Sequence, residues 1–334
     1  MLDDSRFIDF NQSSELVNTY LGNAFKLKVR HEGHIYILKF GAPITAPRPS
    51  EMGSYENSPY SEYLGSHVFE CLGIEAQRTY LGEYRGRLVV ACQDFTDTRD
   101  VHSSLIEFKS LENSFVYGSS STPGRTPILE DVERVLDTHP YLEPIRHDAQ
   151  QRFWETLCVD SLIGNFDRHA SNWGYLLNEE TGSLYKCAPV YDCGSSLSQK
   201  LSEAAMADAL EHPSHLKDIA VRPTMALIVG GAKPRYLDFF QSERSERARE
   251  TLARVLDRVD IERLRSVIAR MPAVSDVRRE FYGAIIAERL DMFSGFITGD
   301  DASARENPSL DRSVTTPAPS WHMERCARND ERSL

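Results

Sequence analysis

Acidic and amide side chains gather in two short stretches of this sequence. In "NFDRHASN" Asp167 and Asn172 stand five residues apart, and in "YDCG" Asp192 precedes a small residue and a glycine. Mg²⁺ prefers hard oxygen ligands, which Asp and Asn supply. Phosphoryl transfer from ATP needs such ligands, together with a carboxylate that orients the acceptor hydroxyl and takes its proton. An Asp and an Asn on one loop, with a further Asp across a hairpin, meet that demand.

Each of these residues also has a purely structural explanation when it is taken alone. The D-x-x-x-x-N spacing is common, and Asp and Asn side chains cap turns for their own reasons. His169, inside the first stretch, could be a structural histidine. A zinc site of His169, Cys187 and Cys193 is disfavoured because their spacing does not fit a structural zinc site. The rest of the chain must therefore decide between a working loop and a solvated turn.

A lysine and a glutamate precede these stretches in the order that a kinase requires. Phosphoryl transfer needs a cation for the α- and β-phosphates, usually a strand lysine held by a helix glutamate. Lys39 lies in the apolar strand "YILKF", and Glu62 lies in the next predicted helix. A lone lysine in an apolar strand is more often an edge or snorkelling residue. Its place before Glu62, the hairpin "RLVVACQDF" and the two polar stretches favours a functional lysine.

The spacing of apolar residues predicts a β-β-α-β-β region that positions Lys39 and Glu62. Phe25–Arg30 and Ile35–Phe40 predict one hairpin, Tyr60–Ile74 a helix, and "AQRTYLGEY" with "RLVVACQDF" a second hairpin. From about Val101 the pattern becomes mainly helical, and "WGYLLN" with "SLYKCAPVYDCG" predicts a short hairpin between the two polar stretches. Further helices are predicted at "ILEDVERVLDT", "DAQQRFWETLCVDSLIG", Glu243–Val259, Asp260–Met271 and Ser275–Phe296.

The composition is that of a globular protein and excludes several classes of function. Hydrophobic residues make up 41% of 334 residues, enough for a real core, and the formal net charge of −12 argues against a general nucleic-acid binder. The six cysteines form no CxxC pair, which predicts buried reduced thiols. The acidic N-terminus lacks the apolar region of a signal peptide, and no apolar run is long enough to span a membrane. These features together predict a cytoplasmic protein.

"LIGNFDRHASNWGYLL…APVYDCGSSL" resembles the C-lobe signature of HipA-type serine/threonine kinases, in particular the compact members without a separate N-terminal subdomain. The resemblance extends to "SEYLGSHVFECLGI" and "VVACQDFTD", and the "DRHxxN" core is also similar to phosphatidylinositol 3- and 4-kinases. It implies an α+β, bilobal protein-kinase-like fold with a small β-rich N-lobe over 15–95 and a mainly helical C-lobe over 96–298. The tail over 299–334, rich in Ser, Pro, Asp and Arg, is predicted to be disordered.

The resemblance also implies a role for each candidate residue. Asp167 would be the catalytic base, Asn172 and Asp192 the magnesium ligands, Lys39 the phosphate-binding cation and Glu62 the residue that orients Lys39. The other residues implied to lie near ATP are His169 and Tyr191, the hinge residues Val90, Ala91, Cys92 and Gln93, and Gly22 and Lys26 of the phosphate loop. That loop, "TYLGNAFKLKV", departs from the usual pattern because it carries one glycine and no G-x-G-x-x-G motif.

These observations favour an ATP- and Mg²⁺-dependent kinase that phosphorylates a protein serine or threonine. One alternative is a lipid or small-molecule kinase of the same fold, although the segment after Asp192 shows no basic cluster for a membrane surface. A second alternative is a nucleotide-binding pseudokinase, favoured by the glycine-poor loop. The resemblance further implies a toxin with an antitoxin partner that itself binds DNA, and autophosphorylation, for which "GSSST" (Gly118 to Thr122) is a candidate or else a plain linker.

Overall fold

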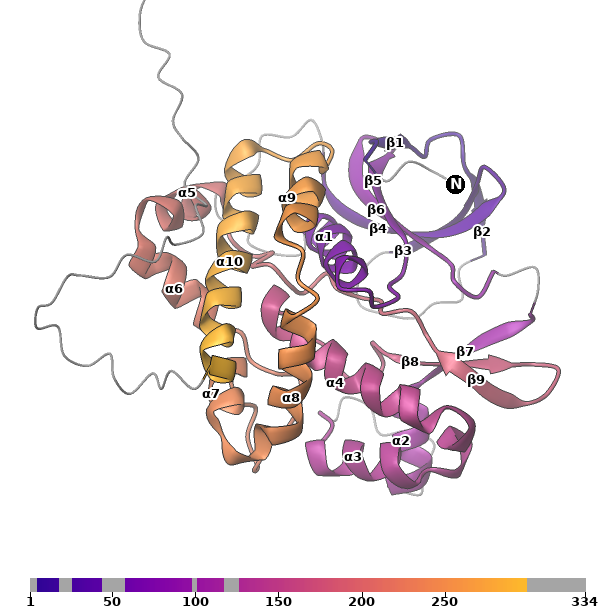
Figure 1. The fold of residues 1–334 in the computed structure, drawn as a ribbon. Helices are drawn as coiled ribbons and strands as arrows, with labels where there is room; N and C mark the ends of the chain where they lie inside the picture. Colours follow the sequence, from indigo (N-terminus) through magenta and orange to yellow (C-terminus); the bar gives the residue numbers. More distant parts are fainter. Residues whose placement is uncertain (1–4, 18–25, 44–57, 98–100, 117–125, 299–334) are drawn as a thin grey trace, which may run out of the picture.

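The computed structural model describes residues 5–17, 26–43, 58–97, 101–116 and 126–298, and divides into a strand-rich part and a helical part (Figure 1). The strand-rich part is a curled six-stranded sheet in the order β1-β5-β6-β4-β3-β2. The pairings are antiparallel except for the parallel pair β1·β5. The strands are β1 (Ile8–Asp9), β2 (Ser14–Leu16), β3 (Lys26–His31), β4 (His34–Pro43), β5 (Thr79–Tyr84) and β6 (Arg87–Gln93).

Two tight turns set the register of the sheet. Glu32 and Gly33 join β3 to β4, and Arg85 and Gly86 join β5 to β6, and all four residues have positive φ. Two-residue turns of this kind match the twist of the strands they connect. The resulting register places Lys39 of β4 opposite Lys26 of β3 on one side and Val90 of β6 on the other. Both predicted hairpins are therefore confirmed.

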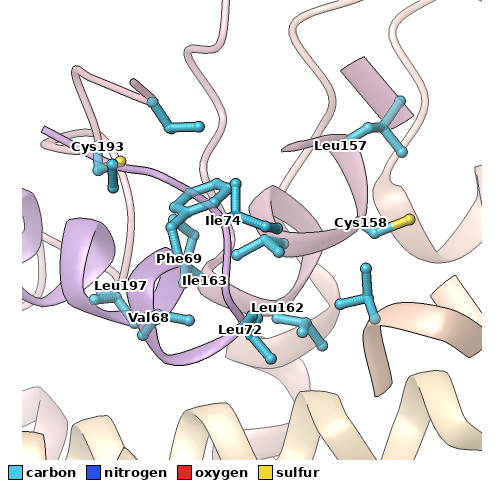
Figure 2. Close-up of a cluster of buried hydrophobic side chains, with 14 of the residues drawn as sticks. Val68, Phe69, Leu72, Ile74, Leu157, Cys158, Leu162, Ile163, Cys193 and Leu197 are labelled. Atoms are coloured by element: carbon cyan, nitrogen blue, oxygen red, sulfur yellow. The ribbon is translucent and has the colours of Figure 1, made fainter. Parts of the chain in front are cut away.

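One helix, α1 (Ser58–Cys71), covers the sheet and carries Glu62 (Figure 1). Most of its side chains are buried, and they pack into a hydrophobic cluster that also contains residues of α4 (Arg146–Ile163). Figure 2 shows Val68 and Phe69 of α1 in the same cluster as Ile163 of α4 and Cys193 and Leu197 of the segment after Asp192. The helix beside the sheet thus shares its core with the helical part. A smaller cluster fills the other face of the sheet around Tyr36 and Leu38.

The helical part is built around α4 and the long helix α10 (Asp276–Thr298) (Figure 1). A second sheet, in the order β7-β8-β9, lies beside α4 and is formed by Ser103–Glu107, Gly174–Asn178 and Ser183–Cys187. The remaining helices are α2 (Phe108–Val116), α3 (Leu129–Thr138), α5 (Glu203–Glu211), α6 (Pro213–Val221), α7 (Tyr236–Gln241), α8 (Glu246–Leu256) and α9 (Ile261–Arg270), with short 3-10 turns η2 (Pro140–Ile145) and η3 (Glu243–Ser245).

The α+β prediction is confirmed, and each element predicted within the described residues is present. The structure adds β1 and β2, which both begin before residue 15, and β7, which extends the predicted hairpin to three strands. It also adds the helices α2 and α5 to α7. The five cysteines in the described part of the chain are buried and reduced, as expected. No helix in the described part is long and apolar enough to cross a membrane. The lobe boundaries stay a prediction, and the tail over 299–334 and the "GSSST" stretch lie outside the described residues.

Candidate active site

Lys39 joins the two parts of the molecule through two carboxylates. Its Nζ donates to Oε1 of Glu62 at 2.8 Å and to Oδ1 of Asp192 at 2.9 Å. Glu62 is fully buried, whereas the side chain of Asp192 is 34% exposed. The sheet, α1 and the "YDCG" stretch therefore meet at one ammonium group. Three residues that the sequence places far apart are brought into direct contact.

Two glycines allow the "YDCG" stretch to lie against α1. A Cβ atom on Gly65 of α1 would come within 2.6 Å of Cβ of Cys193, and one on Gly194 would come within 2.4 Å of Oγ of Ser58 and 3.0 Å of Oε2 of Glu62. Contacts this short require a neighbour to move. The absence of side chains at these two positions is thus what permits the close approach that holds Asp192 near Lys39.

Opposite charges control the ionisation of Lys39 and Asp192. Burial alone would lower the pKa of Lys39, but the carboxylates of Asp192 and Glu62 raise it well above the ordinary lysine value. Burial would raise the pKa of Asp192, but the Lys39 ammonium and the nearby Lys26 hold it well below the ordinary aspartate value. Both groups are therefore charged at neutral pH, as residues that bind phosphate and metal must be.

The loop that follows α4 presents Asp167 to solvent while Asn172 is buried beneath it. Nδ2 of Asn172 donates to the carbonyl oxygen of Asp167 at 2.8 Å, and the backbone N–H of Asn172 donates to the carbonyl oxygen of His169 at 2.8 Å. The loop is thus closed on itself. Asp167 is exposed, as a base that must reach an incoming hydroxyl has to be.

The pKa of Asp167 is raised above the ordinary aspartate value. Partial burial of the carboxyl group by the surrounding protein is the main cause, and the Asp192 carboxylate adds to it. The charges of His169, Arg168 and Lys233 act in the opposite direction. A raised pKa makes a carboxylate a better proton acceptor, provided that it stays ionised at the working pH.

Arg168 holds the loop to its surroundings with all five of its N–H groups. Nε and one Nη donate to the two carboxylate oxygens of Asp160, at 2.9 Å and 3.1 Å, and the same Nη donates to Sγ of Cys193 at 3.4 Å. The other Nη donates to the carbonyl oxygens of Asn172, at 3.0 Å, and of Tyr191. One buried side chain therefore connects α4, the Asp167 loop and the "YDCG" stretch.

Sequence reasoning missed this role of Arg168, although a signal for it was present. Asp160 lies in the apolar run "LCVDSLIG" at the end of α4, where an isolated carboxylate would be costly to bury. Asp160 is 1% exposed, and it also accepts a hydrogen bond from Nδ2 of Asn165 at 3.0 Å. A buried acid in an apolar helix predicts a cation nearby, and Arg168 follows eight residues later.

Three of the predicted nucleotide-binding residues outside the hinge lie in the described part of the chain: Tyr191, His169 and Lys26. Tyr191 lies beside Phe95, with ring centroids 5.7 Å apart, and its hydroxyl donates to the carbonyl oxygen of Ser171. His169 is exposed, and its Nδ1 accepts from the backbone N–H of Ser171 at 3.2 Å. Lys26 lies close enough to Asp192 to lower its pKa, and Gly22 lies outside the described residues.

The predicted hinge residues Val90, Ala91, Cys92 and Gln93 form the end of β6. β6 pairs with β4 and β5 on its two sides, and all four residues take part in the sheet, Gln93 opposite Tyr36 of β4. Ala91 packs into the cluster on the opposite face from Val90 and Cys92. The hinge role of these residues stays a prediction, and the chain leaves the sheet at Asp94 and Phe95.

A cavity of about 40 Å³ is lined in part by Arg168. It is separate from the Lys39 cluster, the group formed by Lys39, Glu62 and Asp192. Its lining includes Asp160, Arg168 and Tyr175, but none of Lys39, Glu62 or Asp192. Ligand pockets for drug-sized molecules have volumes of about 300–1,000 Å³. This cavity is therefore too small for a nucleotide, and the predicted nucleotide-binding residues lie elsewhere.

The donor atoms around Asp192 fit a magnesium nucleotide. Asn172 uses its Nδ2 in the loop, which leaves its Oδ1 as a ligand atom. Asp192 adds a partly exposed carboxylate, so the two residues together supply the hard oxygens that Mg²⁺ prefers. Glu62 keeps Oε2 without a hydrogen-bond partner in the described residues, beside the ammonium group of Lys39.

Comparison with known proteins finds relatives that match most of this chain. Residues 16–265 match the family described as the HipA-like C-terminal domain. The chain is 31% identical over 272 residues to the serine/threonine-protein kinase CtkA of Helicobacter pylori, which covers 80% of this chain and 79% of that protein. The crystal structure of the Helicobacter pylori proinflammatory kinase CtkA superposes with a TM-score of 0.77 at 30% identity, covering 88% of this chain and 97% of that chain.

Proposed function

The chain belongs to the HipA-like C-terminal domain family and is a serine/threonine protein kinase, and from that premise we propose how its residues act. In this proposal the substrates are ATP and a protein serine or threonine, and the metal is Mg²⁺. Asp167 is the base, Asn172 and Asp192 hold the metal, and Lys39 binds the phosphates of ATP.

The observation that carries the proposal is the position of Lys39 between Glu62 and Asp192. A lysine that binds phosphates must be charged and held in place, and the hydrogen bond to the buried Glu62 at 2.8 Å does both. With ATP and Mg²⁺ bound, the Asp192 carboxylate would be a ligand of the metal and the Lys39 ammonium group would bind the phosphates. Bound Mg²⁺ supplies positive charge that neutralises the phosphate oxygens.

Asp167 accepts the proton of the acceptor hydroxyl. Its exposure gives a substrate access, and its raised pKa suits a proton acceptor. Asn172 stabilises the loop through the carbonyl oxygen of Asp167, so that the base and the metal ligand keep a fixed separation. Arg168 is a positioning residue, because it touches neither substrate and acts by holding the two loops together.

For the nucleotide base, the contact with Phe95 favours Tyr191 on the adenine side. The predicted hinge then includes Gln93 and continues into Asp94, whose side chain is fixed by Lys28 at 3.0 Å and by Thr96. Lys26 contributes positive charge beside Asp192, where the glycine-poor phosphate loop would otherwise offer few backbone contacts.

Two finer features of the proposal rest on family membership: a role as the toxin of a toxin–antitoxin pair, and autophosphorylation within "GSSST". A third, a cytoplasmic location, rests on the sequence, which shows no signal peptide and no apolar run long enough for a membrane span. Intact-mass measurement after incubation with ATP and Mg²⁺ tests autophosphorylation, since a gain of one phosphate that disappears when the serines and threonine of "GSSST" become alanine assigns the site. Co-purification with a chain encoded beside this one tests the partner.

The experiment that tests the proposed mechanism is the variant Asp167→Asn. Removal of a general base lowers the rate of phosphoryl transfer by about 10²–10⁴-fold. The exposed position of Asp167 means that the fold survives, which a thermal melt checks. Transfer is followed with radioactive ATP and a generic protein acceptor, with and without Mg²⁺. Unchanged labelling by the variant would remove Asp167 from its role.

Two rival activities give different results in simple assays. A lipid kinase would sediment with anionic lipid vesicles and label them from ATP. A pseudokinase would be stabilised against heat by ATP and Mg²⁺ without any turnover. The presence of Lys39, Asp167, Asn172 and Asp192 favours a working kinase over a pseudokinase. The lack of a basic cluster in the segment after Asp192 disfavours the lipid kinase.

A further inference from the structure

A cluster of one aspartate and two histidines lies outside the active site, where α5 ends and α6 begins. Among the described residues, these three side chains each offer one possible metal-ligand atom, and the three atoms lie within 4.8 Å of one another. Its members are Asp208, His212 and His215. Nothing in the proposed phosphoryl transfer uses them.

The corner between the two helices creates this cluster. Asp208 and His212 stand four residues apart, which places them on the same face of α5. His212 is both the C-cap of α5 and the N-cap of α6, and Pro213 starts the new helix. Because the chain changes direction there, the third residue of α6, His215, turns back toward Asp208.

The three side chains lie close enough to share one metal ion, because one possible ligand atom from each lies within 4.8 Å of the other two. Nδ1 of His215 lies 2.7 Å from Oδ2 of Asp208, a hydrogen-bond distance that would widen around an ion. In a tetrahedral site with metal–ligand distances of about 2.0–2.1 Å, neighbouring ligand atoms are about 3.4 Å apart. The two imidazole rings are 5.0 Å apart and inclined by 33°. Small rotations of half-exposed side chains therefore bring the three groups onto one ion.

Hydrogen bonding prepares His212 to act as a ligand. Its Nδ1 lies 2.9 Å from the carbonyl oxygen of Asp208, a group that can only accept a hydrogen bond. The proton therefore sits on Nδ1, and the lone pair is on Nε2. This type of second hydrogen bond commonly orients metal-binding histidines.

We propose that Asp208, His212 and His215 form a binding site for a transition-metal cation, with Zn²⁺ as the best fit. Two imidazole nitrogens and one carboxylate suit Zn²⁺ and related ions, whereas Mg²⁺ prefers oxygen ligands alone. Three protein ligands leave a fourth position for water. The side chains are about half exposed, so the ion enters without any opening of the fold.

Metal binding at this corner would stabilise the region that follows the "YDCG" stretch. The ion would fix the end of α5 to the start of α6. α5 is in turn attached to α10 by Glu203, which accepts from Oγ of Ser275 at 2.9 Å and lies 3.8 Å from Arg278. A ligand that binds only the folded state raises the melting temperature in proportion to the logarithm of its concentration.

Titration of the untagged, chelator-treated chain with Zn²⁺ against a chromophoric chelator tests this inference. One equivalent should bind, and His212→Gln, His215→Gln and Asp208→Asn should each weaken binding by at least about tenfold. His147→Gln is the matched control, because His147 is an exposed histidine that meets a single carboxylate, Asp148, at 3.5 Å. It should bind Zn²⁺ like the unmodified chain. Equal affinity in all four variants would overturn the inference.

Two further measurements separate this site from the magnesium site of the proposed kinase. Millimolar Mg²⁺ should leave the bound Zn²⁺ in place, and Asp167→Asn should bind the same one equivalent. Zn²⁺ should raise the melting temperature of the unmodified chain but not that of the His212→Gln/His215→Gln variant. If Mg²⁺ displaces Zn²⁺, or if the double variant is stabilised equally, the metal binds elsewhere. These results do not depend on phosphoryl transfer.

Discussion

Two charged clusters, one around Arg168 and one around Lys39, differ in how many of their polar atoms have hydrogen-bond partners within the protein. Around Arg168 all five N–H groups have partners, and Asp160 opposite is 1% exposed. Around Lys39 one carboxylate is partly exposed, and Oε2 of Glu62 has no hydrogen-bond partner in the described residues. The first cluster is complete within the protein, and the second has capacity left for a ligand.

This difference separates a positioning role from a binding role. A buried ion pair gains little net stability because its desolvation is costly, but loss of one partner leaves an uncompensated charge. The Arg168 cluster therefore acts on the fold, since it ties α4 to both loops. The Lys39 cluster has a partly exposed carboxylate, so in the proposed mechanism Asp192 would hold the metal while Glu62 keeps Lys39 in place.

The largest effect on stability is expected for Arg168→Met. Breaking a buried pair by removal of one partner costs about 3–5 kcal/mol in the free energy of unfolding. Denaturant unfolding measures it. The double variant Arg168→Met/Asp160→Asn should recover part of the loss, because the buried charge is gone. Arg258→Met removes a pair in which the arginine is 36% and Glu155 11% exposed, and it should cost less than Arg168→Met because this arginine keeps contact with water. A similar loss of stability in both single variants would show that the Arg168 cluster contributes no more to stability than the pair between Arg258 and Glu155.

Lys39→Met should affect catalysis more than folding. Loss of one group that stabilises the transition-state charge lowers the rate by about 10²–10³-fold, or about 2.7–4 kcal/mol. Because Lys39→Met leaves the fully buried Glu62 without its cation, it should also lower the free energy of unfolding, and Glu62→Gln added to it should recover part of that loss. Rates with radioactive ATP and denaturant unfolding give the two numbers. Loss of stability equal to that of Arg168→Met, with activity retained, would make Lys39 a structural residue.

Gly194→Ala should disturb the Lys39 cluster by steric pressure alone. The new methyl group would meet Oγ of Ser58 at 2.4 Å and Oε2 of Glu62 at 3.0 Å, and overpacking of this kind costs about 1–3 kcal/mol. Denaturant unfolding and the rate of transfer should both fall. The double variant Ser58→Ala/Gly194→Ala relieves the closer contact and should recover part of both. Gly295→Ala, with no atom within 4 Å of the new methyl, is the control and should be neutral or stabilising.

The smallest effect is expected in the pH dependence, where activity and stability should fall at different pH. Asp167 must be ionised to act as a base, and its pKa is raised. As the pH is lowered, activity should therefore be lost at a pH above the ordinary aspartate pKa. The pKa of Asp192 is lowered in the folded state, so its contribution to stability is present above about pH 3.9 and is lost as the pH falls below that value. Rates and unfolding across pH 3–8 check this. Coincident losses would contradict the separation.

The reacting residues could be predicted from the sequence because chemistry restricts their types and order. Asp167 and Asn172 belong to one loop, and their separation is fixed by five residues of chain. Lys39, Glu62 and Asp192 could be ordered along the chain but not placed in contact, since that depends on how the sheet packs on the helical part. The structure brings those three together, while their roles in transfer stay predictions.

The contacts and strands that hold the candidate site in place were harder to predict from the sequence than the candidate residues themselves. Arg168 bonds to backbone carbonyl oxygens, which carry no sequence signal, and only Asp160 pointed to it. The strand β1 is two residues long, too short for an alternating pattern to be visible. The predicted hinge depended on where β6 ends, and strand ends are the least certain feature of a pattern because neighbouring strands decide them.

The burial of α1 has a consequence for how this protein could be switched off. Nearly every side chain from Pro59 to Cys71 is covered, by the sheet, by α4 and by α9, and the hydroxyl of Tyr60 donates to the carbonyl oxygen of Ala273 at 2.9 Å. A conformer with α1 displaced would expose this apolar surface at about 25 cal/mol for each Å². Displacement of α1 is therefore an unfavourable way to separate Lys39 from Glu62, and an inhibitor that blocks access to the site would avoid that cost.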